Sequence, residues 1–157
     1  MRNVWFPAVN AFVAAGAGFL LAVLWFDLMF DVQALGARDA VLPEEVLASI
    51  AGYYRRVTRQ AQRMNKLVAA VMAGTLAAIV VQIAKGDDPA WVGWVSLALV
   101  VPAVALAATH TFGAGARLGA RRDSPEVQSA IARSILRDHL LCLPAIATVL
   151  VIQLAVA

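Results

Sequence analysis

The sequence contains two histidines, and both can lie beside carboxylates. Asp27 and Asp31 are four residues apart, so in a helix their side chains share one face. His110 closes one apolar stretch of the chain, and His139 opens another. Converging imidazoles and carboxylates can bind zinc or iron, and a histidine beside a carboxylate can act as a base. Asp27, His110 and His139 are therefore candidate catalytic residues, and the same three with Asp31 are candidate metal ligands.

Four apolar segments must position these residues. They run from about 4 to 26, 67 to 84, 91 to 110 and 140 to 157, and each approaches the ~20 residues that a helix needs to cross a bilayer. Hydrophobic residues make up 62% of the chain, which exceeds the usual share in soluble domains. Continuous apolarity also excludes the strands of a transmembrane barrel. The sequence predicts a single all-α domain over residues 1–157, an integral membrane four-helix bundle.

Positive charge indicates how this bundle is oriented. Of the 13 Lys and Arg residues, only Arg2 and Lys85 fall outside the two long connections, the first-to-second and the third-to-fourth. Because cytoplasmic loops are enriched in Lys and Arg, we expect both long connections in the cytoplasm and both termini outside a bacterial inner membrane. The lipid bilayer is then the expected partner. The net charge of +3 follows from this topology and does not indicate nucleic-acid binding.

Helices two and four are expected to extend beyond the membrane into the cytoplasm. Pro43 followed by two glutamates predicts a helix start, and an amphipathic stretch from 44 to 66 leads into the second span. The fourth helix is expected to begin at Asp123 or Ser124, with Pro125 in its first turn. An unbroken helix from 43 to 84 would be about 63 Å long. It must either project into the cytoplasm or bend near Gly52.

All four helices place a polar residue at one depth, the cytoplasmic membrane boundary. Asp27 and His110 lie at similar distances along their helices, Asn65 precedes the second span, and Asp138 with His139 precedes the fourth. Ionisable residues at membrane depth are costly and often mark functional sites. The alternative is that these residues only mark the membrane edge, with the carboxylates paired to nearby arginines.

Three kinds of chemistry remain open for a shared site, and the cofactor is unknown. Imidazoles and carboxylates could hold zinc or iron, and two imidazoles could hold haem. Without a cofactor, His110 or His139 could transfer a proton to or from a lipid-soluble substrate, with Asp27 orienting the ring.

The sequence Arg137-Asp138-His139 at the start of the last span carries a resemblance. With the amphipathic helix leading into the second span, it resembles the anthrone-oxygenase-like family of small bacterial four-helix membrane proteins. In that family an Arg-x-Asn-His-like sequence opens the fourth span, so Asp138 stands where asparagine is expected, and His110 falls where an asparagine-containing stretch is expected. The resemblance implies oxidation of a lipophilic aromatic, with His139 as the residue carried over.

Three functions follow from these features. A membrane oxidoreductase or oxygenase-like enzyme requires Asp27, His110 and His139 to converge. An accessory or assembly subunit of a larger membrane complex, or a homo-oligomer, would use small residues such as Gly74 to pack on partners. A small transporter would need a charge near the bilayer midplane, where the sequence offers only uncharged groups such as Asn10. The sequence favours the enzyme over the other two.

Overall fold

The computed structural model describes residues 6–36, 41–86 and 89–156, and the side chains from residue 8 onward. These residues form helices and short connections, without a strand among them. The helices are α1 (Phe6–Asp31), α2 (Glu44–Arg55), α3 (Gln62–Ala84), α4 (Trp91–Leu106), α5 (Phe112–Ala120) and α6 (Pro125–Ala155). A 3₁₀ turn (Val32–Leu35) follows α1, and π-helical segments follow α2 (Arg56–Gln60) and α4 (Ala107–Thr111). The predicted all-α fold is confirmed.

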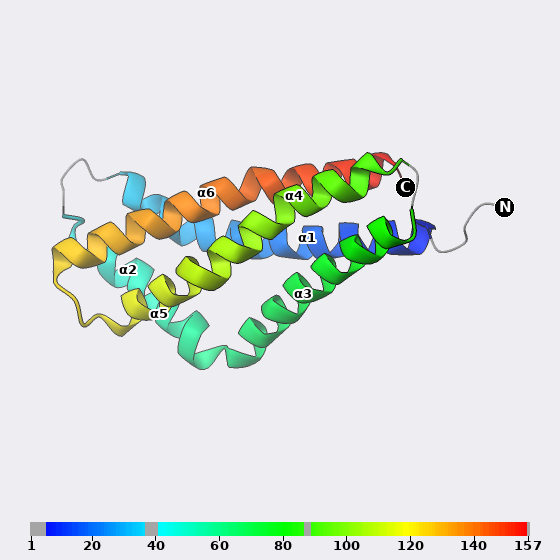
Figure 1. Cartoon of the computed structure of the whole chain (residues 1–157). Coiled ribbons are helices and arrows are strands. Elements are labelled where there is room, and N and C mark those ends of the chain that lie inside the picture. Colours follow the sequence, from blue (N-terminus) through cyan, green and yellow to red (C-terminus); the bar gives the residue numbers. More distant parts are fainter. Residues whose placement is uncertain (1–5, 37–40, 87–88, 157) are drawn as a thin grey trace.

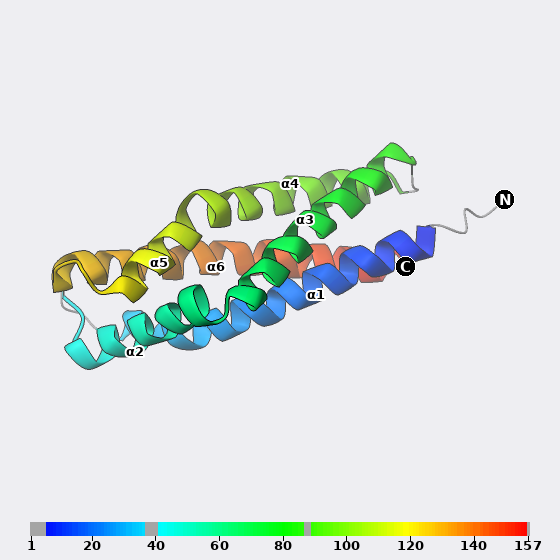
Figure 2. The same ribbon diagram turned by 90° about the horizontal axis from the view of Figure 1, so that it is seen from below.

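The helices are arranged as four antiparallel segments of a bundle (Figure 1). α1 is the first segment, α2 and α3 together make the second, α4 and α5 the third, and α6 the fourth. α1 and α6 run side by side in both views, and α3 diverges from α2 at an elbow (Figure 2). The start of α1, the end of α6 and the α3–α4 connection lie at the same end of the molecule.

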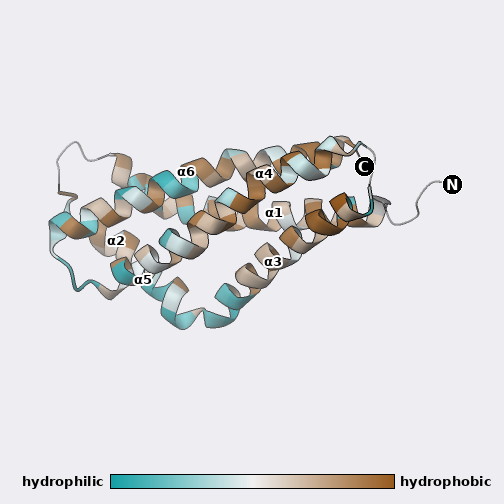
Figure 3. Cartoon of the chain, in the orientation of Figure 1, coloured by the Kyte–Doolittle hydropathy of each residue, from teal (hydrophilic) through white to brown (hydrophobic). Residues whose placement is uncertain are grey.

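Four helical stretches are long and apolar enough to cross a membrane: Ala8–Leu35, Gln62–Ala84, Trp91–Ala120 and Pro125–Ala155. Only 22% to 39% of their most apolar windows is buried inside the chain. Exposed apolar surface on this scale is typical of a lipid-facing protein. Hydrophilic residues gather at the elbow and at the end of the bundle away from the termini (Figure 3). The helices of the first and third spans continue beyond the predicted ends at 26 and 110.

The predicted helix starts are confirmed. Of the two alternatives for the long helix from 43 to 84, the structure shows a bend, but not near Gly52. α2 begins directly after Pro43, and α6 begins at Pro125 with Ser124 as its N-cap. Gly52 lies inside the regular part of α2. The bend falls at Ala61, whose φ of −97° and ψ of 40° are not helical. Its N–H donates to the carbonyl of Arg56, five residues back, and this π-type bond ends the helix.

The bundle has two apolar cores. One lies between the spanning parts of the helices and includes Val13, Ile79, Val100 and Val149. The other fills the end away from the termini, where α2, α5, the first half of α6 and the end of α1 pack together; it includes Leu47, Ile50, Tyr54, Leu118 and Ile135.

Two glycines let α2 and α5 approach closely in this second core. A Cβ atom on Gly119 would lie 2.7 Å from the backbone nitrogen of Arg55, and one on Gly115 would lie 2.8 Å from the ring of Tyr54. Real Cβ atoms are not found this close to other heavy atoms, so only glycine fits at these positions. The close approach fixes where Tyr54 lies.

Candidate functional site

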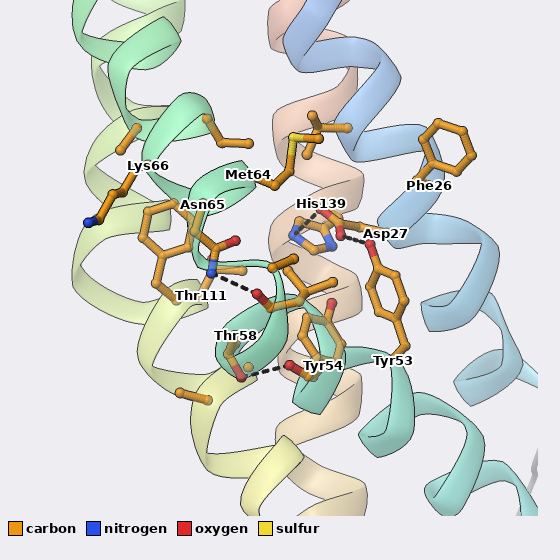
Figure 4. Close-up of a pocket in the computed structure, with 18 of the residues that line it drawn as sticks. Phe26, Asp27, Tyr53, Tyr54, Thr58, Met64, Asn65, Lys66, Thr111 and His139 are labelled. Atoms are coloured by element: carbon orange, nitrogen blue, oxygen red, sulfur yellow. Dashed lines mark hydrogen bonds and ion pairs between the residues drawn. The ribbon is translucent and has the colours of Figure 1, made fainter.

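A cavity of about 760 Å³ lies between the two cores, beside the elbow. This volume falls within the range of small-molecule sites in proteins. The walls are mostly apolar, and the polar residues among them include Asp27, Tyr53, Asn65 and His139 (Figure 4). All four segments of the bundle therefore contribute to one cavity, at the depth where the sequence predicted polar residues to gather.

His139 is fixed at the cavity wall by a buried carboxylate. Its Nδ1 lies 2.6 Å from Oδ2 of Asp31, which is fully buried. The hydroxyl of Tyr54 donates to both oxygens of the same carboxylate, at 2.9 and 3.1 Å. Hydrogen bonds to an ionised acceptor are among the stronger ones in proteins. Asp31 therefore orients the imidazole, and Tyr54 orients Asp31.

A second carboxylate lies at the opposite edge of the imidazole. Oδ2 of Asp27 is 3.8 Å from Nε2 of His139, and Oδ1 accepts a hydrogen bond of 2.5 Å from the hydroxyl of Tyr53. The ring of Phe30 stacks on Tyr53 with centroids 4.2 Å apart, which holds the phenol in place. His139 thus stands between two carboxylates, each bound by its own tyrosine.

The hydrogen bonds decide which groups donate. Asp31 accepts, so in the neutral form of His139 we assign the ring proton to Nδ1, and Nε2 is then an acceptor at the cavity. Burial, and then the nearby Asp27, raises the pKa of Tyr53 above its usual value of 10. Burial, and then Asp31, does the same to the pKa of Tyr54. Both phenols therefore remain protonated donors at neutral pH.

The second histidine belongs to a different pair. Nδ1 of His110 lies 2.6 Å from Oδ2 of Asp138, and the hydroxyl of Thr111 donates to that oxygen at 2.7 Å. The side chain of His110 is 46% exposed and does not line the cavity. The structure brings Asp27, Asp31 and His139 together and leaves His110 outside. The predicted convergence of Asp27, His110 and His139 is therefore met by Asp27 and His139 but not by His110.

This separation bears on the cofactor hypotheses. Within the described residues, no three or more His, Cys, Asp or Glu side chains are placed so that they could hold a metal ion. The proposed ligand set of Asp27, Asp31, His110 and His139 is therefore not assembled. The two imidazoles bond to different carboxylates, His110 to Asp138 and His139 to Asp31.

Asn65 lies at the elbow, where α3 begins. Its Nδ2 donates to the carbonyl of Val57 at 2.9 Å, across the break at Ala61. The π-helical segment and the break release that carbonyl from regular helical bonding, so the amide takes over as its partner. Asn65 was predicted to lie at the same depth as the other polar residues. Its side chain joins the two sides of the helix break through this hydrogen bond and also lines the cavity.

Tyr53 and Tyr54 were not predicted as site residues from the sequence. Arginines were the suggested partners of Asp27 and Asp31, but the structure pairs these carboxylates with the two tyrosines and with His139. Adjacent residues on a helix point about 100° apart, so a pair of neighbours reaching two carboxylates depends on how the helices cross. The signal available was weaker: two tyrosines on an amphipathic helix that must pack near the end of the first span.

No protein-family model, curated protein or solved structure matches this chain. The chemistry of the site therefore rests on its own geometry. An imidazole oriented by a buried carboxylate, with its other nitrogen at an apolar cavity, can accept a proton from a bound molecule.

Proposed function

We propose that this chain is a membrane-embedded enzyme that binds a lipid-soluble molecule in the cavity and removes a proton from it, with His139 as the base. One observation carries the proposal. Nδ1 of His139 is bonded at 2.6 Å to the buried Asp31, while the ring lines a largely apolar space of about 760 Å³. This arrangement matches the needs of a general base: fixed orientation, a free acceptor nitrogen and limited water.

The proposed step moves one proton. The bond between hydrogen and a substrate atom breaks, its electron pair stays on the substrate, and a bond forms between that hydrogen and Nε2 of His139. The ring then carries a positive charge between Asp27 and Asp31, and both carboxylates stabilise it. Asp31 is a positioning residue, and Tyr53 and Tyr54 hold the two carboxylates.

The substrate is expected to reach the cavity from the bilayer. Phe26, Met64 and Phe112 line the cavity and are also 61%, 51% and 49% exposed. They therefore form an apolar rim on the outer surface of the bundle, which in a membrane faces lipid. A lipid-soluble molecule could pass this rim without crossing a polar surface.

The oxidation implied by the anthrone-oxygenase-like resemblance is a specific form of this proposal. His139, the residue carried over by the resemblance, would deprotonate the lipophilic aromatic. The resulting anion would be the electron donor, and molecular oxygen, which must come from solution, would be the oxidant. His110 has no part in this scheme because it lies outside the cavity.

We also propose a bacterial cytoplasmic membrane, with both termini on the outer side. The basic residues of α2, α5 and the elbow lie at the end of the bundle away from the start of α1, and positive charge favours the cytoplasm. Fusions at the C-terminus test this. A reporter that is active only outside the cytoplasm should give signal, and one that is active only inside should not; the reverse pattern would overturn the orientation.

A lipophilic nitrophenol tests the function, because its anion absorbs at longer wavelength than its neutral form. At a pH where the free probe is neutral, probe bound to the purified chain should show the anion band. His139→Gln should remove the band, whereas the matched His110→Gln should keep it. Ala69→Trp, at the cavity wall, should weaken binding, and its neighbour Ala70→Trp, which does not line the cavity, should not.

The proposal fails if wild-type protein gives no anion band, or if His139→Gln leaves the band unchanged. An accessory or assembly subunit, the alternative function, would then be the next to test. In that case the chain should co-purify with other membrane subunits from its native host.

A further inference from the structure

Five side chains that line the polar part of the cavity each donate a hydrogen bond to an acceptor within the chain. The hydroxyls of Tyr53 and Tyr54 donate to Asp27 and Asp31. The remaining donations are those of Thr58 to the carbonyl of Tyr54, Thr111 to Asp138 and Asn65 to the carbonyl of Val57. Lys66 also lines the cavity, but its ammonium group points away from Asp27 and His139 (Figure 4).

Apart from the second amide hydrogen of Asn65, the side-chain groups of this part of the cavity that can meet a ligand are acceptors. They are the carboxylate of Asp27, Nε2 of His139 and the side-chain oxygen of Asn65. A carboxylate has more lone pairs than the single hydroxyl of Tyr53 uses, and a neutral imidazole bonded through Nδ1 presents a lone pair on Nε2. The polar part of the cavity therefore offers acceptors from α1, α3 and α6.

The orientation of Asn65 is set by its partner. The carbonyl of Val57 can only accept, so the amide nitrogen must face it. The amide oxygen then points the other way, and Figure 4 shows it on the side toward His139. Asn65 thus presents a fixed acceptor opposite the imidazole.

We infer that the ligand of this cavity is a lipophile carrying a hydroxyl group, with Asn65 as a specificity-determining residue. The inference rests on the proposed function and names its substrate class. A hydroxyl can donate to Nε2 of His139 or to Asn65, whereas an ether or a carboxylate would set acceptor against acceptor. Asp27 would also repel a carboxylate. The proton that His139 removes is then the hydroxyl proton itself.

Three probes with the same ring system test the hydroxyl preference on the full-length, detergent-solubilised chain. Naphthol, its methyl ether and naphthoate differ in the polar group and share the ring system. Naphthol should bind roughly tenfold more tightly than the ether, because one hydrogen bond to a charged or oriented acceptor is lost. Naphthoate should bind more weakly than the ether. Isothermal titration in the same detergent measures all three.

Two variants locate the preference. Asn65→Leu should reduce the advantage of naphthol over the ether severalfold, and its midpoint of thermal unfolding reports whether the elbow is kept. Asn65→Gln, which retains both an amide donor and an amide acceptor, should preserve more of the advantage than Asn65→Leu does. Ala69→Trp should weaken binding of both neutral probes, and the control Ala70→Trp should not.

The outcomes separate this inference from the proposed function. If naphthol and ether bind equally, and Ala69→Trp weakens both, the hydroxyl preference is overturned while the cavity remains a site for lipophiles. If naphthoate binds most tightly, the inference is also overturned. If naphthol is preferred but the nitrophenol probe is not deprotonated through His139, the ligand class stands and the enzyme proposal fails.

Discussion

The molecule buries two polar clusters at different depths along the bundle, one near the termini and one between the two apolar cores, and they are built differently. The amide cluster consists of Asn10, Gln82, Ser96 and Gln153, one from each of α1, α3, α4 and α6. Nε2 of Gln82 donates to Asn10 at 2.7 Å, and Nε2 of Gln153 lies 3.1 Å from both Gln82 and Ser96. All four residues are buried and uncharged. Within the described part of the chain, Nδ2 of Asn10 is the one amide hydrogen donor of this cluster without a partner.

The ionisable cluster consists of Asp27, Asp31, Tyr53, Tyr54 and His139. Like the amide cluster it joins several helices, but its imidazole lines a cavity. The amides of the first cluster bond mainly to one another, which ties four helices together in an apolar environment. The second cluster keeps an acceptor directed at a space that a ligand can fill. The comparison suggests that one cluster holds the bundle together and that the other carries out its chemistry.

The largest expected effect comes from Asp31→Asn. An asparagine can keep the shape but cannot hold Nδ1–H as a carboxylate does, so the imidazole loses its orientation and the support for its positive charge. The ratio of anion to neutral form of the bound nitrophenol probe should fall by about a hundredfold or more. Gln82→Leu, in the amide cluster, should leave this ratio unchanged. A similar loss of probe deprotonation in both variants would mean that the chemistry does not belong to the ionisable cluster alone.

A smaller effect is expected for Gln153→Leu, and on stability instead of activity. The change removes the hydrogen bonds to Gln82 and Ser96, and hydrogen bonds between helices in a membrane contribute about 0.6 to 1.7 kcal/mol. The free energy of unfolding, followed by helical signal in mixed detergent, should fall by about 1 to 2 kcal/mol. Thr148→Val, an exposed change on the same helix, is the control and should have little effect. An unchanged stability for Gln153→Leu would remove the amide cluster from its structural role.

The sequence predicted the helices better than it predicted the site. The lengths of the apolar segments predicted four helices long enough to span a membrane, and proline next to acidic residues predicted the starts of α2 and α6. Asp27 and His139 were predicted to converge because counting residues along a helix gives depth. Depth does not give the direction of a side chain around the helix axis, so His110 was expected in the same site although it bonds to Asp138. The position of the elbow was also missed, because Ala61 carries no breaker signal and the bend depends on the preceding π-helical segment.

The last prediction concerns the ionisation of Tyr53 and Tyr54, which has no effect at neutral pH. It separates the two clusters because only the ionisable cluster has side chains that titrate. The chain has two tyrosines, Tyr53 and Tyr54, so its phenolate absorbance reports on this cluster alone. Their pKa values in the folded chain are raised by burial and by the neighbouring carboxylates, whereas the unfolded chain has the usual value of about 10. The folded state therefore binds these protons more tightly. The stability that they contribute is fully present below about pH 10 and is lost as the pH rises through the folded pKa values.

A spectrophotometric titration in detergent should show no phenolate until the pH is well above 10, and denatured protein should titrate near 10. Asp27→Asn should bring the ionisation of Tyr53 to lower pH, because it removes the negative charge that opposes the phenolate, and Tyr53→Phe assigns the remaining signal to Tyr54. Gln82→Leu should not move the curve. If both tyrosines of the folded protein titrate near pH 10, the phenols are not buried against Asp27 and Asp31. The orientation of His139 by those carboxylates would then lose its support.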